Sequence, residues 1–297
     1  MNKAAQKPQL SATLSPHRPT RFRWQAFAIH LGISLAILAV LLYLLFYHWF
    51  PDYLFDTDGG WQALRVIAGV DIVLGPVLTL IAANPAKTTR ELRRDFSLIG
   101  LIQAAALGGG IWLAWDNRPY AVFWFDGSFQ SQPWSSFHDE KAARSWIKNR
   151  HETTPMMVYV DLPDDIFRRS ELLRQALSEG RSLMFSAPLL RAWPGNPVQI
   201  RAHAGSHRKW LAADAQREKT YRARLAELHL DDATTLPVAT RSRYGTYFLL
   251  LSAATLRPVG IAAIAPPHEM LAGLMPNPHS NADDKNIAPQ RLPKTQP

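Results

Sequence analysis

The chain has 297 residues, a formal net charge of +9 and no cysteine, and 47% of its residues are hydrophobic. Without cysteine it has no disulfide, no thiolate metal site and no cysteine nucleophile. The basic residues form no stripe with interleaved aromatic residues, so we expect no binding to nucleic acid. The apolar residues, in contrast, are concentrated in three runs between residues 24 and 115.

We predict that these runs are three transmembrane helices over about residues 24–50, 61–83 and 96–115. At 1.5 Å per residue, about 20 helical residues cross a hydrocarbon core of about 30 Å. The first run ends in His-Trp-Phe-Pro and is too long for the apolar part of a signal peptide, so we interpret it as a retained span. Together they form a transmembrane domain over 23–116, after a disordered cytoplasmic arm over 1–22.

The short loops between the runs predict the orientation. The N-terminal arm and the loop 84–95 are rich in Lys and Arg, whereas the loop 51–60 has neither. The positive-inside rule places the basic segments in the cytoplasm. The chain that follows the third span then lies on the outer side, so we expect a bacterial inner-membrane protein with a periplasmic C-terminal domain.

The fold class that we predict is a membrane protein whose three N-terminal helices precede a periplasmic α+β domain over 117–265. Short β-branched and aromatic runs predict strands, and amphipathic patterns with capping residues predict helices. We expect strands over 121–125, 156–160, 246–252 and 258–265, and helices over 139–149, 163–179 and 208–230. Beyond residue 265 the chain is rich in proline, which predicts a disordered tail over 266–297.

Asp71 is a carboxylate near the middle of the second run, followed by Gly75-Pro76. An ionisable group at this depth is costly, and a proline inside a helix leaves a backbone carbonyl without its donor. Counting residues places Asp71 about 15 Å from the outer edge, and His30 and Gln103 about 10 Å from the cytoplasmic edge. The three side chains could therefore meet near the midplane. We favour a helix-packing role for Asp71 over proton transport, because polar groups within membranes commonly bridge helices.

Several glycines lie in the same apolar runs: Gly69, Gly75, Gly108, Gly109 and Gly110. Small residues let two helices approach closely. The pattern leaves open whether they pack within this chain or against a helix of another membrane protein. A flexible or kinked region without a partner is the remaining interpretation.

The sequence gives no positive sign of catalysis. His203 and His207 have a spacing that two metal ligands could use on a helix, but Gly205 separates them and no third ligand is evident. We interpret them as exposed polar histidines. Motifs of zinc proteases, P-loops, dinucleotide-binding folds and serine hydrolases are absent. We therefore expect no cofactor, no metal site and no enzymatic activity.

Seven segments together resemble the type IV pilin accessory proteins of the TfpX/TfpZ kind. The most recognisable is the segment 69–80, which begins Gly-Val-Asp-Ile-Val-Leu-Gly-Pro and includes Asp71, Gly75 and Pro76, but the segments are specific only as a set. The others are residues 23–31, 59–61, 84–87, 92–95, 102–107 and 118–123. The resemblance is close over about residues 23–126 and loose in the remainder. It implies an inner-membrane protein that assists type IV pilus assembly and catalyses no reaction.

The partners that this resemblance implies are the major type IV pilin and the pilus assembly machinery, together with membrane lipid. An unassembled pilin is anchored in the inner membrane by one apolar helix, and its globular head lies outside. A glycine-lined membrane groove and an exported domain could engage both parts and hold or present the subunit. The alternative function is a membrane-bound sensor or small transporter subunit that uses Asp71.

Overall fold

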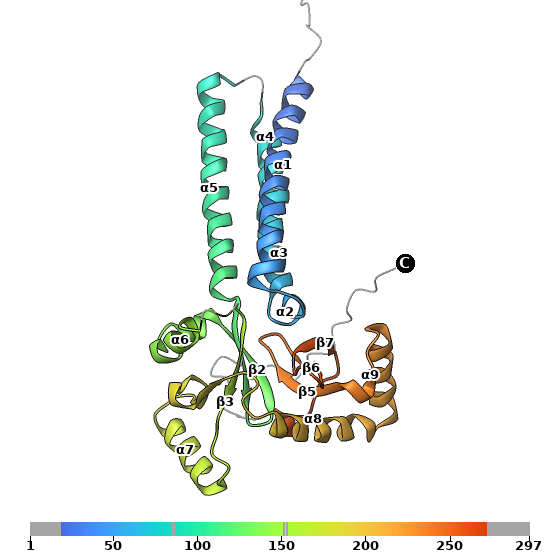
Figure 1. Ribbon diagram of the computed structural model, residues 1–297. Helices are drawn as coiled ribbons and strands as arrows, with labels where there is room; N and C mark the ends of the chain where they lie inside the picture. Colours follow the sequence, from blue (N-terminus) through green and yellow to red (C-terminus); the bar gives the residue numbers. More distant parts are fainter. Residues whose placement is uncertain (1–18, 85–86, 151, 153, 272–297) are drawn as a thin grey trace, which may run out of the picture. The chain divides into compact units, whose positions relative to one another are not determined.

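The computed structural model describes residues 19–84, 87–150, 152 and 154–271, which fold as two compact units (Figure 1). The first unit ends at Arg118 and the second begins at Pro119. Most of the predicted arm and tail lies outside the described residues. Within them, the first helix already begins at Pro19, and a short 3₁₀ helix covers His268–Met270.

The first unit is helical. Its elements are α1 (Pro19–Leu44), a π-helical turn (Leu45–Trp49), α2 (Leu54–Thr57), α3 (Gly60–Ala68), the π-helical segment η2 (Gly69–Leu74), α4 (Gly75–Ala82) and α5 (Thr89–Asp116). Three stretches are long and apolar enough to cross a membrane: Trp24–Trp49, Gly60–Ala82 and Thr89–Asp116. The length and composition of these helices confirm the prediction of three stretches that could cross a membrane.

The middle stretch, formed by α3, η2 and α4, packs against both of the others. α4 contacts α1, while α3 and α4 contact α5. α5 begins with a capping box, in which the Glu91 N–H donates to Thr88 Oγ1 and the Thr88 N–H donates to the Glu91 carboxylate. An apolar core joins the stretches and consists of Leu41, Leu45, Trp49, Phe50, Phe55, Ile67 and Ala114.

The second unit is a mixed sheet with helices, which confirms the α+β prediction. The strands are β1 (Pro119–Phe125), β2 (Ser128–Pro133), β3 (Met156–Val160), β4 (Leu190–Ala192), β5 (Thr235–Arg241), β6 (Thr246–Ser252) and β7 (Pro258–Ala262). Their order in the sheet is β4-β3-β1-β2-β5-β6-β7. β1 pairs parallel with β3, and β2 pairs parallel with β5. All other neighbours are antiparallel.

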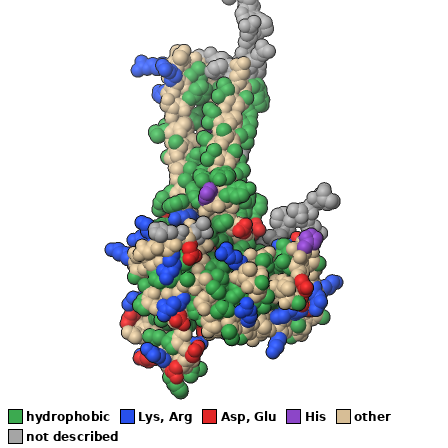
Figure 2. All heavy atoms as spheres, in the orientation of Figure 1, with side chains coloured by type: hydrophobic (Ala, Val, Ile, Leu, Met, Phe, Trp, Pro, Cys, Tyr) green, Lys and Arg blue, Asp and Glu red, His purple; other side chains and the backbone are tan. Residues whose placement is uncertain are grey.

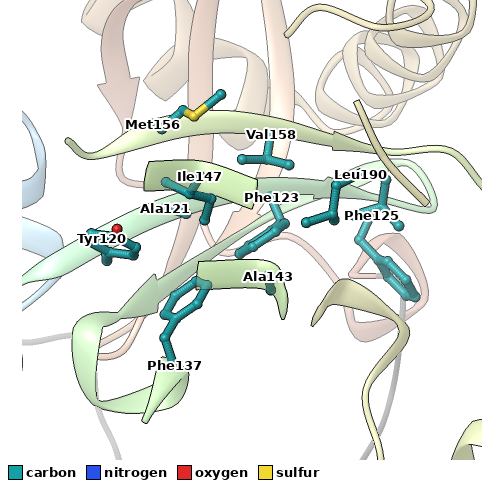
Figure 3. Packing of buried hydrophobic residues seen from close by; sticks show 11 residues of the cluster. Tyr120, Ala121, Phe123, Phe125, Phe137, Ala143, Ile147, Met156, Val158 and Leu190 are labelled. Atoms are coloured by element: carbon teal, nitrogen blue, oxygen red, sulfur yellow. The ribbon is translucent and has the colours of Figure 1, made fainter. Parts of the chain in front are cut away.

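In the described part of this unit, four α-helices accompany the sheet: α6 (Lys141–Lys148), α7 (Ile166–Ser178), α8 (Pro197–Ala212) and α9 (Ala215–Glu227). Figure 3 shows the core between β1, β3 and α6, where Phe123, Phe137 and Ile147 lie together. A second core lies where β6 meets α8 and α9, around Phe248 and Tyr221. The apolar runs of the strands thus supply both cores.

The structure corrects several predicted boundaries through its caps. The helix expected over 208–230 is two helices, because the Asp214 carboxylate accepts the Arg217 N–H and starts α9 anew. The helix expected from Pro163 begins at Ile166, since Asp165 is its N-cap. The sequence also missed β2, β4 and β5. The pairing of the last two strands was expected and is present.

Candidate functional site

Asp71 joins the three long helical stretches of the first unit. Its side chain is 2% exposed and lies on η2. The Asp71 Oδ1 atom accepts a hydrogen bond of 2.8 Å from Gln103 Nε2 on α5 and one of 3.1 Å from Ser34 Oγ on α1. The structure therefore brings together Asp71 and Gln103, as depth counting suggested, and adds Ser34.

His30 takes part in a separate bridge. Its Nδ1 atom lies 2.6 Å from Thr79 Oγ1, which connects α1 with α4. The structure thus places His30 on Thr79 and not on Asp71. Sequence reasoning missed both hydroxyl residues. Their positions along the helices could have indicated them: Ser34 follows His30 by one helical turn and Thr79 follows Asp71 by about two turns, so each pair lies on one side of its helix.

The backbone around Asp71 departs from a regular α-helix. Pro76 has no N–H, so one backbone carbonyl before it lacks its usual hydrogen-bond donor. This carbonyl is that of Ile72 in an α-helix and that of Asp71 in a π-helix. Gln103 Nε2 donates to the Asp71 carbonyl oxygen at 3.4 Å as well as to the Asp71 carboxylate. One amide therefore serves both the side chain and the interrupted backbone.

Gly75 leaves the space that this amide occupies. A Cβ atom at position 75 would overlap the side-chain amide of Gln103. The Gly75-Pro76 pair therefore has two complementary effects: proline disrupts the helical bonding, and glycine admits the side chain that compensates for it. This is a packing explanation for a motif that is otherwise unfavourable in a helix.

The cluster retains unused acceptors. Asp71 Oδ2 and Gln103 Oε1 are buried and have no hydrogen-bond partner among the residues that the structure describes. Within the same residues, no His, Asp or Glu bonds to Asp71 to extend a proton path. A carboxylate held by an amide and a hydroxyl can fasten helices together by hydrogen bonds, which is the chemistry that this geometry supports.

The five candidate glycines fall into two groups. Gly75 and Gly110 face other helices, and a Cβ atom at Gly110 would lie 3.4 Å from Val66 Cγ1. At Gly69, Gly108 and Gly109 an added Cβ atom would meet nothing within 4 Å. Packing inside the unit therefore accounts for two of the glycines and gives no reason for the other three.

The expectation that His203 and His207 are exposed is wrong. Both lie on the face of α8 that packs towards the sheet, and His207 is only 4% exposed. Its Nδ1 atom accepts the Ala239 N–H of β5 at 3.3 Å. Burial lowers the pKa of His207 to about 4. Across the described ranges, no group of three His, Cys, Asp or Glu residues could hold a metal ion.

Comparison with known proteins gives three similar sequences, all from Dichelobacter nodosus. The fimbrial assembly protein of serogroups C1 and C2 is 38% identical over 94 residues, which are 32% of this chain and 72% of that protein. The fimbrial assembly proteins of serogroup I (38%) and serogroup E1 (36%) also match over 94 residues, but these are 37% of their length. No family model and no solved structure matches the chain.

Proposed function

The chain belongs to the family of fimbrial assembly proteins, and from this premise we propose that it is a non-enzymatic accessory factor of type IV pilus assembly that engages the major pilin. The observation that carries this proposal is the 38% identity that covers 72% of a fimbrial assembly protein. Within the family, the block at 69–76 and its flanking motifs support assignment to the TfpX/TfpZ group. The proposed role is to hold or present the pilin before it enters the fibre.

The proposed site of action is the bacterial inner membrane. Exposed aromatic residues near the ends of the apolar helices support it, because Trp and Tyr favour the membrane surface. Trp24 lies near one end of the first span, and Tyr43 and Tyr47 near its other end. The basic loop before α5 supports a cytoplasmic N-terminus and a periplasmic second unit.

The Asp71 cluster supports the accessory role over a transport role. Ser34 and Gln103 donate hydrogen bonds to Asp71 from two other helices. About one helical turn away along α1, a hydrogen bond between His30 and Thr79 joins α1 and α4. Such bonds fix the three stretches as one body with its lipid-facing sides free. A rigid body of this kind can offer a defined surface to the single apolar helix of an unassembled pilin.

The test is deletion of the gene and complementation with the full chain and its variants. We expect deletion to reduce surface piliation or the steady-state level of pilin, and the full chain to restore it. If deletion leaves both quantities unchanged, the proposal fails.

A pair of variants separates packing from proton transfer in the same assay. Asp71→Asn still accepts hydrogen bonds from Gln103 and Ser34, so we expect partial piliation at a normal protein level. Complete loss of piliation with a normal level of the Asp71→Asn protein would instead support obligatory proton transfer.

A further inference from the structure

One exposed side of α5 carries a series of side chains that we call the open face of α5. Its residues are exposed and lie within about 120° of one another around the helix: Arg90, Arg93, Arg94, Ser97, Gly100, Leu101, Ala104 and Gly108. The side of α5 that faces the bundle carries Gln103, Gly110 and Ala114, and its centre lies about 120° around the helix from that of the open face.

Packing among the described residues gives no reason for the glycines of the open face. A Cβ atom added at Gly100 or Gly108 would meet nothing within 4 Å. A glycine inside a helix costs about 0.5–1 kcal/mol relative to alanine. Lipid tails need no small side chains beside them, whereas a second helix that packs closely does. The open face is therefore shaped for a helix.

The end of the open face where α5 begins carries positive charge that the described residues neutralise only in part. The Glu91 carboxylate accepts the Thr88 N–H at 2.8 Å within the cap, and Asp95 pairs with Lys87 at 2.6 Å and more loosely with Arg94 at 3.7 Å. No carboxylate of the described residues pairs with Arg90 or Arg93. Figure 2 shows Lys and Arg side chains gathered at this end. The positive end of the helix dipole adds to the same field.

We propose that the open face of α5 binds one transmembrane helix of a partner protein, and that this helix carries a carboxylate near its cytoplasmic end. From Arg93 to Gly108 the face extends about 22 Å, most of a membrane span. The small residues set the close contact, and the arginines set its register through the carboxylate. The inference rests on the proposed function, in which this partner is the unassembled pilin.

The first experiment is photo-crosslinking in cells from two alanines of α5. Ala104 lies on the open face, while Ala106 is also exposed but about 200° away around the helix. With a photoreactive amino acid at each position of the full chain, we expect at least fivefold more adduct from Ala104. Mass spectrometry should identify the adduct as a single-span protein with a carboxylate at its cytoplasmic end. Equal yields at both positions would overturn the inference.

Steric and charge variants decide which feature of the face is used. With the photoreactive group at Ser97, Ala104→Leu and Gly108→Leu should lower the adduct at least fivefold, and the control Ala106→Leu should not. Arg90→Gln with Arg93→Gln should also lower it, in protein whose topology is shown unchanged by tag accessibility. Replacing the partner's carboxylate by Gln should then cause no further loss.

Other occupants give different results, and each overturns the inference. An adduct of twice the mass of this chain would mean a second copy. Sensitivity to the Arg variants without sensitivity to Ala104→Leu would mean contact with lipid headgroups. If gene deletion abolishes piliation but Ala104 gives no adduct, the docking face is wrong while the proposed function stands. If deletion leaves piliation unchanged, the proposed function fails whatever Ala104 contacts.

Discussion

The two units contain polar clusters that hold helices together by different chemistry. In the first unit the Asp71 carboxylate, 2% exposed, is bonded to the neutral groups of Gln103 and Ser34. In the second unit Arg208, whose side chain is 22% exposed, binds two carboxylates at once. Its guanidinium contacts Glu218 at 2.6 and 2.8 Å and Asp232 at 2.7 and 2.8 Å.

The difference follows from the surroundings of each cluster. Bringing charges out of water costs several kcal/mol per ion, which an ion pair recovers only with complete hydrogen bonding. Near water, Arg208 meets this condition, and the paired charges hold α8 and α9 together. Among apolar helices, Asp71 has neutral partners and leaves Oδ2 unpaired. Charge pairs therefore hold the more exposed of these two clusters together, and uncharged donors hold the buried one.

Lowering the pH should affect the second unit most, because it also buries a neutral base. Burial beside His203 lowers the pKa of His207 to about 4, although a hydrogen bond to the backbone of Pro237 acts in the opposite direction. Between pH 6.5 and 4 the unfolded chain binds a proton at His207 that the folded unit does not, so the unit loses stability as the pH falls. We expect a loss of about 2 kcal/mol by pH 5 and about 3 kcal/mol by pH 4.

Hydrogen exchange of the α8 and β5 peptides in the full chain measures this loss. Substitution His207→Gln should flatten the pH dependence of this loss between pH 6.5 and 5. An unaltered slope in His207→Gln would contradict the assignment.

Arg208→Met should be the next most damaging change. It removes the guanidinium that binds both Glu218 and Asp232 most closely, and we expect a loss of about 2 kcal/mol, reduced from the value for a fully buried pair because water reaches the site. Arg222 also pairs with Glu218 but is 64% exposed, so Arg222→Met should cost less than about 1 kcal/mol. Denaturant unfolding followed by exchange of the α9 peptides tests the ratio. Equal losses would mean that burial does not govern this cluster.

Substitutions of Asp71 should have smaller effects, since hydrogen bonds between membrane helices are worth about 0.6–1.7 kcal/mol. Asp71→Leu leaves Gln103 and Ser34 without their acceptor, and we expect a loss of about 1–2 kcal/mol. Asp71→Asn should retain most of the stability. Unfolding of the full chain by SDS, read from exchange of the α4 and α5 peptides, compares the two. Equal stability of Asn and Leu variants would show that the bonds do not hold the stretches together.

The sequence predicted the features that depend on local pattern and depth. Three apolar runs indicated the three helices, and counting residues inward brought Asp71 to the level of Gln103. It did not predict the His30–Thr79 contact, because the rotation of each helix about its axis depends on tertiary packing. The strand β2 was missed because its Ser-Phe-Gln-Ser-Gln-Pro sequence is polar, although its first four residues are buried between β1 and β5. The orientation of His207 was missed for the same reason, since helical spacing does not say which face meets the sheet.

Substitution of Gly75 by alanine should have the smallest effect on stability, and it tests the hydrogen bonds of the Asp71 cluster. A methyl group there displaces the Gln103 amide, which is the flexible end of a side chain, so the cost is the loss of its bonds to Asp71, about 1 kcal/mol. Gly69 is the matched control, because it lies one and a half turns away with nothing within 4 Å of an added Cβ atom. Gly69→Ala should stabilise the helix by about 0.5–1 kcal/mol, since alanine is the better helix former. The SDS midpoints of the two variants should therefore move in opposite directions. A shared direction would mean that Gly75 is present for flexibility and not to admit Gln103.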